Sequence, residues 1–290
     1  MLIAQITDIH LGFDPINPDE FNRQRLDATL KVLRAIEPAP DLMLVTGDIA
    51  NDGDDRQSYA RWKEAIAGLS FPIYPLMGNH DSRAPFLELF PETGNADGFI
   101  QYAIEDHPLR ILVLDTLEVG RHGGGFCTKR AAWLRDRLDE APERPTLIAL
   151  HHPPISTGIP WLTEDPDAPW ARRLEELIEG RRNIVAMVAG HVHRPIVTRW
   201  AGTALLVCPS TAPQVALDLT PIDANTPDDR PMIVADPPGF ALHRWDGRQL
   251  ISHFDTAEEH EIIARYTPKL QPLVRMLLEE KEGSTLLQFP

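Results

Sequence analysis

The segment Leu44–Gly53, which reads LVTGDIANDG, decides the fold of this chain. A run of apolar and β-branched residues ends at Gly47 and is followed at once by Asp48. A buried parallel strand delivers a carboxylate to the mouth of its sheet in this way. We therefore predict that Asp48 bridges two metal ions.

One aspartate after a strand is weak evidence, because such residues are usually turn residues or helix caps. Other predicted strands, however, also end in ligand-type side chains. These strands are Leu2–Thr7, Phe71–Met77, Thr146–Leu150 and Asn183–Ala189. The side chains that follow them are Asp8 and His10, Asn79 and His80, His151 and His152, and His191 and His193. We expect these groups to converge on one site, since the carboxyl ends of parallel strands meet at one edge of a sheet.

The spacing within each pair predicts which side chains point the same way. In an extended segment, residues two apart share a face, so Asp8 and His10 are predicted to reach one ion. The two histidines of the last pair have the same spacing and are predicted to serve one ion or two adjacent ions. His151 and His152 are neighbours and should point to opposite faces, which predicts that only one is a direct ligand.

The tetrad Gly78-Asn79-His80-Asp81 is the most specific of these motifs. Asn79 offers a neutral oxygen ligand, and His80 offers an imidazole. Asp81 is predicted to hold the tautomer of His80 by accepting its other N–H. The alternative is a glycine turn with asparagine in a left-handed conformation.

The remaining pattern alternates helices with strands, which is typical of an α/β domain with parallel sheets. Helices are predicted at Phe21–Ile36, Asp55–Leu69, Thr128–Leu138 and Trp170–Glu179. Further strands are predicted at Phe99–Glu105, Arg110–Asp115, Ile196–Trp200 and Ala204–Cys208, with a hairpin of Phe240–Trp245 and Gln249–Phe254. Residues 212–238 are rich in proline and acidic residues, and we expect an irregular cap there.

Near the C-terminus, an amphipathic helix is predicted with Thr267 as N-cap and Pro268 as its first residue. Its apolar stripe runs to Gly283 and comprises Leu270, Leu273, Val274, Leu277 and Leu278. The helix either packs on its own domain or docks on a partner subunit together with Leu286, Leu287 and Phe289. The chain thus divides into a catalytic core at residues 1–211, a cap segment and hairpin at 212–265, and a helix and tail at 266–290.

The loop Gly120–Gly125 is rich in glycine but lacks the spacing of a phosphate-binding or dinucleotide-binding loop. Either it is a flexible surface loop, or it borders the active site with His122 touching substrate.

Composition limits the partners and the compartment. A net charge of -15 disfavours binding to a nucleic-acid backbone. The cysteines, Cys127 and Cys208, are too few for a disulfide framework, which fits a reducing compartment. A strand is predicted almost from residue 2, which leaves no room for a signal peptide, and no apolar run reaches about 18 residues. We therefore expect a cytoplasmic protein without a membrane span.

In order and spacing, these motifs resemble the calcineurin-like metallophosphoesterase family over residues 1 to about 210. The opening QITDIHL and the segment HHPP are most similar to the branch that contains class III cyclic nucleotide phosphodiesterases and bacterial glycerophosphodiesterases. The resemblance implies an α/β fold, a four-layer αββα sandwich, with a small C-terminal cap region.

The resemblance also implies roles for individual residues. The first ion would be held by Asp8, His10, Asp48 and His193, and the second by Asp48, Asn79, His151 and His191. His80 would contact the phosphate and protonate the leaving group, with Asp81 orienting it, while His152 would lie outside the ligand set. Purple acid phosphatases have a tyrosine where this chain has Asn51, so no tyrosinate-bound ferric ion is expected.

The predicted function is hydrolysis of small phosphodiesters, either cyclic nucleotides or glycerophosphodiesters, by in-line attack of a hydroxide that bridges two divalent ions. Manganese, iron, zinc and cobalt all suit the mixed oxygen and imidazole ligands. Substrate is expected to contact Asn79, His80 and His122, with specificity set by the loops Gly120–Gly125, Ile155–Pro169 and Ala212–Pro238. The alternatives are a phosphomonoesterase, a nuclease, a mononuclear hydrolase and a non-catalytic scaffold. A homo-oligomer would form through the cap or the C-terminal helix.

Overall fold

The computed structural model describes residues 1–281 of the chain. Residues Met1–Ala257 form one compact unit, and a second unit begins at Glu258. Within residues 1–281, no helix is long and apolar enough to cross a membrane.

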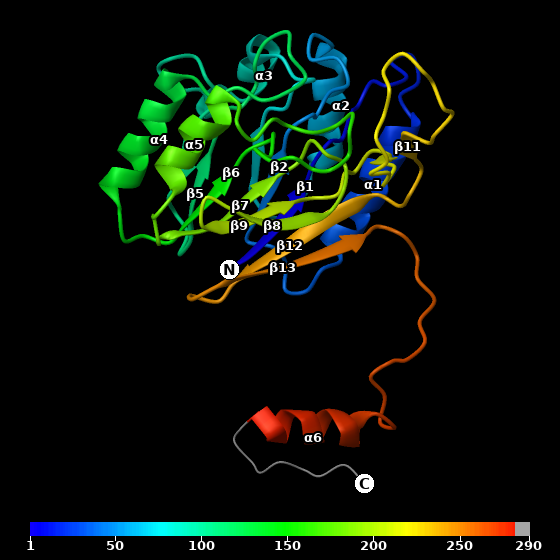
Figure 1. Cartoon of the computed structure of the whole chain (residues 1–290). Coiled ribbons are helices and arrows are strands. Elements are labelled where there is room, and N and C mark those ends of the chain that lie inside the picture. The colour runs from blue at the N-terminus through cyan, green and yellow to red at the C-terminus, as the bar shows by residue number, and fades with distance from the viewer. Residues whose placement is uncertain (282–290) are drawn as a thin grey trace. The chain divides into compact units, whose positions relative to one another are not determined.

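Two mixed β-sheets form the centre of the first unit (Figure 1). In the five-stranded sheet, β1, β2 and β3 are parallel, and the antiparallel hairpin β12–β13 pairs with β1. In the six-stranded sheet, β5, β6, β7 and β9 are parallel, with antiparallel β4 and β8 at the edges. The first sheet is ordered β13 (Leu250–Thr256), β12 (Gly239–Trp245), β1 (Leu2–Ile6), β2 (Leu42–Thr46), β3 (Ile73–Leu76). The second is ordered β4 (Tyr102–Ile104), β5 (Arg110–Val113), β6 (Thr146–Ala149), β7 (Ile184–Ala189), β9 (Thr203–Val207), β8 (Ile196–Trp200).

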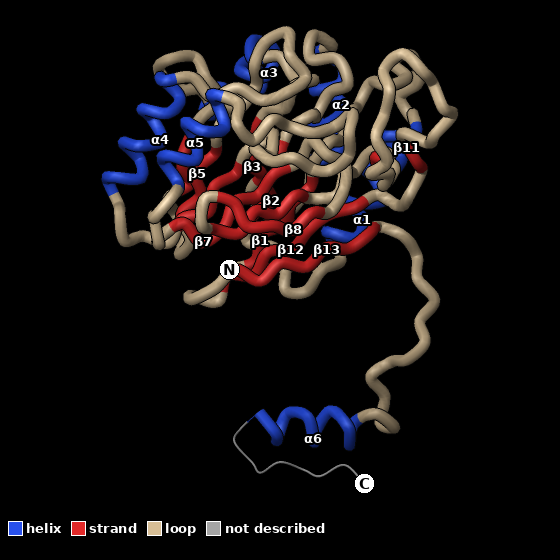
Figure 2. The backbone as a smooth tube through the Cα atoms, in the orientation of Figure 1, coloured by secondary structure: helices blue, strands red, loops and turns tan. Residues whose placement is uncertain are grey.

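Alternating side chains on these strands separate the molecule into layers, because successive residues of a strand face opposite sides. In β2, Leu42 and Leu44 pack in a core between the two sheets, whereas Met43 and Val45 pack beneath the helices of the first sheet. This confirms the predicted αββα sandwich. Within the first unit, Figure 2 shows the strands at the centre with the helices outside them.

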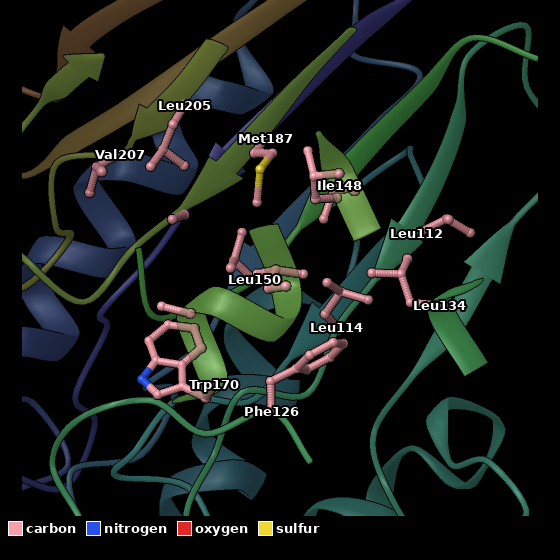
Figure 3. Close-up of a cluster of buried hydrophobic side chains, with 14 of the residues drawn as sticks. Leu112, Leu114, Phe126, Leu134, Ile148, Leu150, Trp170, Met187, Leu205 and Val207 are labelled. Atoms are coloured by element: carbon pink, nitrogen blue, oxygen red, sulfur yellow. The ribbon is translucent and has the colours of Figure 1, made fainter. Parts of the chain in front are cut away.

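Each outer layer of helices is held by its own apolar cluster. The first sheet is covered by α1 (Phe21–Arg34), α2 (Arg56–Ile66) and α3 (Arg83–Leu89), the last followed by the 3-10 turn η1 (Pro91–Thr93). The second is covered by α4 (Thr128–Glu140) and α5 (Pro169–Ile178). Figure 3 shows the second cluster, in which Leu134 and Trp170 from the helices join Leu112, Ile148 and Met187 from the strands.

Some local predictions were wrong. The cap is not wholly irregular, since β10 (Gln214–Val215) pairs with β11 (Ile233–Val234). Helix α3 was not predicted, because its seven residues are too few for a periodic signal.

The second unit contains α6 (Gln271–Lys281). Thr267 and Pro268 do not start this helix. Instead they form a turn before it, in which the Thr267 carbonyl accepts hydrogen bonds from the backbone N–H groups of Leu270 and Gln271. The predicted end of the helix and the apolar tail lie outside the described residues, namely Gly283, Leu286, Leu287 and Phe289.

Candidate metal centre

The predicted ligand residues lie where the strands end, but the backbone there is not extended. Asp8, His10, Asp48, His191 and His193 all have positive φ, between 50° and 72°. The extended backbone predicted for both i, i+2 pairs was therefore wrong, although Asp8 and His10 do converge in one group. Left-handed turns aim these side chains instead, and such strained non-glycine residues are typical of functional sites.

Glycines beside the ligands allow the backbones to approach closely. A Cβ on Gly78 would lie 2.1 Å from Asp48 Oδ1, and one on Gly190 would lie 2.0 Å from Thr7 Oγ1. Both distances are far below van der Waals contact. Because Gly78 and Gly190 have no side chain, the ends of the neighbouring strands can come this close to them.

Asp8, His10 and His193 form the first group of converging side chains. His193 Nδ1 donates to the Pro213 carbonyl at 2.8 Å, which leaves Nε2 directed at the other two residues. That Nε2 lies 3.4 Å from Asp8 Oδ1 and 3.1 Å from His10 Nε2. Backbone carbonyls hold metal-binding histidines in this manner.

Asp48, Asn79 and His151 form the second group. His151 Nδ1 donates to the Thr46 carbonyl at 2.7 Å. Its Nε2 lies 3.3 Å from Asp48 Oδ2 and 3.2 Å from Asn79 Oδ1. The two groups adjoin, since the same Nε2 is 3.9 Å from Asp8 Oδ1.

His191 joins the second group through edge-on and tilted ring contacts. Its ring centroid is 5.1 Å from that of His151 and 4.8 Å from that of His122. The His191 backbone N–H donates to the Asp8 carboxylate at 2.9 Å, which ties the two sheets together at the site. His122 is thus brought to the edge of the cluster.

His152 is buried within the cluster rather than on an opposite face. Its ring centroid is 4.7 Å from that of His151. The Thr116 hydroxyl donates to its Nδ1 at 2.8 Å, and its Nε2 donates to the His122 carbonyl at 3.2 Å. Although His152 is close enough to be a ligand, both of its nitrogens are engaged with protein groups. We therefore place it beside the ligands rather than among them.

Asp81 does not orient His80 as predicted. Its carboxylate accepts hydrogen bonds from the Tyr59 hydroxyl at 2.9 Å and from the backbone of Gly78 and Ala50 at 2.9 and 3.2 Å. The side chain is turned toward the loops because these donors surround it. Asp81 therefore fixes the backbone around Asp48 and Asn79.

His80 is held by other groups. Its backbone N–H donates to Asp48 Oδ1 at 2.8 Å, and its ring Nδ1 donates to the Asn51 carbonyl at 2.9 Å. The His80 ring also lies beside the cluster, with its centroid 4.6 Å from that of His10, and it falls in one group with His10 and Asp48. His80 and Asn79 line an open cleft of about 390 Å³ that also contains Arg83 and Val119.

Electrostatics in the cluster match what a cation requires. Burial alone would raise the pKa of Asp48, but His151 holds it well below its usual range. Burial lowers the pKa of His10 to about 3, against the pull of Asp48, so this imidazole is neutral. Burial opposes protonation of His151 as well, yet Asp48 raises its pKa to about 9. A cation would replace the proton that this pair attracts, since metal ligands bind in their deprotonated forms.

The residues present therefore fit a metal ion. The nitrogens of His10 and His193 that face each other are only 3.1 Å apart. In the neutral tautomer, His193 directs a lone pair into this gap, because its other nitrogen donates to Pro213. The facing nitrogen of His10 can donate a proton to this lone pair or share a cation with it, so the gap suits a proton or a metal ion.

The loop Gly120–Gly125 is not a flexible surface loop throughout. Gly124 and Gly125 are buried. A Cβ on Gly124 would lie 2.8 Å from the Trp170 ring and 2.9 Å from His152 Cβ. The loop therefore packs between α5 and the cluster, and this packing presents His122 to the site.

The sequence did not reveal the groups that hold the site in place. The backbone carbonyls of Thr46 and Pro213 hold His151 and His193. The hydroxyl groups of Thr116 and Tyr59 hold His152 and Asp81, which lie beside the candidate ligands. A backbone carbonyl carries no sequence signal at all. For Tyr59, the only sign was a tyrosine on the apolar face of a predicted helix.

Comparisons with known proteins show what this chain is similar to. The family described as calcineurin-like phosphoesterase matches residues 1–195. A probable glycerophosphodiester phosphodiesterase of Arcobacter nitrofigilis is 31% identical over 254 residues, covering 86% of this chain and 90% of the relative. A probable cyclic nucleotide phosphodiesterase of Rhodopseudomonas palustris is 32% identical, covering 87% and 91%. The 3',5'-cyclic adenosine monophosphate phosphodiesterase of Escherichia coli K12 is 31% identical, covering 73% and 76%.

Solved structures support the fold. A dimetal phosphatase from Danio rerio superposes with a TM-score of 0.64 at 14% identity, covering 89% of this chain and 97% of that one. A purple acid phosphatase from yellow lupin gives a TM-score of 0.63 at 13% identity, covering 89% and 51%.

Proposed function

Because this chain belongs to the calcineurin-like phosphoesterase family, we propose that it hydrolyses small phosphodiesters with the help of two divalent ions. It is a phosphoric diester hydrolase, as its relatives of about 30% identity are. Those relatives are named for glycerophosphodiesters and for cyclic nucleotides. We propose that the substrate of this chain belongs to one of these classes.

The observation that carries the proposal is the convergence of carboxylate, amide and imidazole groups from both sheets. One ion is assigned to Asp8, His10, Asp48 and His193, and the other to Asp48, Asn79, His151 and His191. Asp48 belongs to both sets because its Oδ2 lies 3.7 Å from His10 Nε2 and 3.3 Å from His151 Nε2. When bound, divalent ions of this kind neutralise phosphoryl charge and lower the pKa of the attacking water.

The side chains around the ions would handle the substrate. We assign the role of general acid to His80, because its Nδ1 is fixed by Asn51 and its Nε2 is left for the departing oxygen. Asn79 and His122 would contact the phosphate from either side of the cluster. The leaving group would lie in the cleft beside Arg83 and Val119. Asp81, which was expected to orient His80, is assigned to the loop backbone instead.

The test is hydrolysis of bis(p-nitrophenyl) phosphate beside p-nitrophenyl phosphate. Protein is first stripped with a chelator and then reconstituted with Mn²⁺. We expect faster turnover of the diester, dependent on metal, and then hydrolysis of cyclic AMP or a glycerophosphodiester. Cleavage of the monoester alone would instead identify a phosphomonoesterase.

Three variants distinguish loss of the metal centre from a general loss of activity. Asp48→Ala and Asn79→Ala should abolish both turnover and Mn²⁺ binding, because each removes a shared or neighbouring ligand. His253→Ala is a matched control, since this histidine is exposed on β13 away from the cluster. A wild-type protein that binds no metal would favour the non-catalytic scaffold, and a single bound ion would favour a mononuclear hydrolase.

We also propose that the chain forms a homo-oligomer through α6. Leu273, Leu277 and Leu278 are 49%, 45% and 54% exposed on this helix. A second copy of the chain would cover this stripe. Sedimentation of the full-length protein beside Leu277→Glu tests the assignment, which fails if both sediment as monomers.

A further inference from the structure

Gln5 is a fully buried polar residue in a strand that is otherwise apolar. It lies on the same face of β1 as Ile3, which packs in the core between the two sheets. An unpaired amide in such a place would be destabilising. The hydrogen-bond partners of the Gln5 amide therefore indicate its role.

The Gln5 amide joins three strands in two sheets. Its Nε2 donates to Thr46 Oγ1 of β2 at 2.8 Å and to the Ala189 carbonyl of β7 at 3.0 Å. The first acceptor belongs to the five-stranded sheet and the second to the six-stranded sheet. The amide is thus a direct bridge between the two sheets.

His243 of β12 holds this amide in place. Its Nε2 donates to Gln5 Oε1 at 2.9 Å, and the Ser252 hydroxyl donates to its Nδ1 at 2.7 Å. His243 is fully buried, and burial lowers its pKa to about 4, so the ring is neutral and its tautomer is fixed. All polar atoms of the Gln5 and His243 side chains are therefore paired, and the amide cannot flip without losing bonds.

The strands that Gln5 joins are the ones that deliver the ligands. Thr46 is followed by Gly47 and Asp48, and Ala189 is followed by Gly190 and His191. The carbonyl of Thr46 also accepts the hydrogen bond from the ring of His151. Gln5 therefore lies directly below ligands that come from both sheets.

We propose that Gln5, fixed by His243, is a positioning residue that sets the spacing of the two sheets beneath the metal centre. The inference rests on the proposed function, because it concerns the ions of that site. A cation held by ligands from both sheets depends on this spacing, because the bridge joins the strands that precede Asp48 and His191. Outer residues that orient ligands typically change metal affinity by about 10-fold to 100-fold.

The test is isothermal titration of chelated protein with Mn²⁺, together with thermal unfolding. Gln5→Met keeps the length of the side chain but removes both donor and acceptor. We expect at least about tenfold weaker Mn²⁺ binding. His243→Phe leaves Gln5 Oε1 without its donor and should weaken binding in the same direction. It also serves as the second variant if Gln5→Met does not fold.

Leu44→Ala is the control, because Leu44 is an apolar residue of the same layer between the sheets and adds no hydrogen-bonding side chain to the bridge. It should lower the melting temperature while Mn²⁺ affinity stays at the wild-type value. At saturating Mn²⁺, Gln5→Met should regain most of its turnover with an unchanged KM for bis(p-nitrophenyl) phosphate.

Wild-type Mn²⁺ affinity in both Gln5→Met and His243→Phe would overturn the inference and leave the proposed function intact. A wild-type protein that binds no Mn²⁺ would overturn both. Equal loss of affinity in Leu44→Ala would show that loosening the layer is enough, which also contradicts a specific role for the amide.

Discussion

Replacing Gly78 by alanine should disable the site while leaving the fold in place. The new Cβ would lie 2.1 Å from Asp48 Oδ1 and 2.7 Å from the Asp48 backbone nitrogen. Ordinary contact between such atoms is about 3.5 Å, so the carboxylate would have to move by more than about 1 Å. The Asp48 carboxylate lies one bond from its own Cβ and the Asp48 backbone nitrogen is also in the way. The clash therefore cannot be relieved by moving the end of a long, flexible side chain.

A shift of about 1 Å at a reacting centre costs about 100-fold in rate. Two tenfold steps of about 1.36 kcal/mol correspond to roughly 2.7 kcal/mol of lost transition-state stabilisation. We expect kcat of Gly78→Ala on bis(p-nitrophenyl) phosphate to fall by about this factor, with weaker Mn²⁺ binding.

Gly180→Ala is the matched control. Gly180 follows α5, has a φ of 78° and has no atom within 4 Å of an added Cβ. It should lose about 1–2 kcal/mol of unfolding free energy through its left-handed backbone and keep its turnover. If Gly78→Ala retained both kcat and Mn²⁺ affinity, the assignment of Asp48 as the shared ligand would be refuted.

Three further outcomes follow from the described contacts. His80→Ala should lower kcat by about 100-fold to 10,000-fold without changing Mn²⁺ affinity in a direct titration, because its backbone N–H still reaches Asp48. Tyr59→Phe removes a hydrogen bond to the buried Asp81 carboxylate and should cost about 1.5–3 kcal/mol in urea unfolding; an unchanged midpoint would contradict the contact. Leu30→Ala in the fully buried face of α1 should cost about 2–5 kcal/mol in the same assay while turnover at 25 °C is retained.

The candidate site was accessible to sequence reasoning because each candidate ligand lies within four residues of the end of a strand. Asp48 and His151 could be identified from the run before them, without knowledge of how the strands are ordered. The orientation of Asp8 and His10 was predicted from extended geometry, yet both residues are left-handed. A short motif does not show whether its backbone is extended or left-handed, since the φ values depend on how the two sheets meet.

The sequence by itself determined the alternation of helices and strands and the residue types that gather at the strand ends, while the four-layer arrangement was implied by the resemblance to a known family. Periodicity and the position of glycine are local properties, so they can be recognised along the chain. Only the tertiary structure decided that Asp81 holds a loop rather than His80, that His152 is engaged by Thr116, and that Gln5 bridges the sheets. Each of these depends on hydrogen bonds between residues distant in sequence, whose directions are fixed when the sheets pack together.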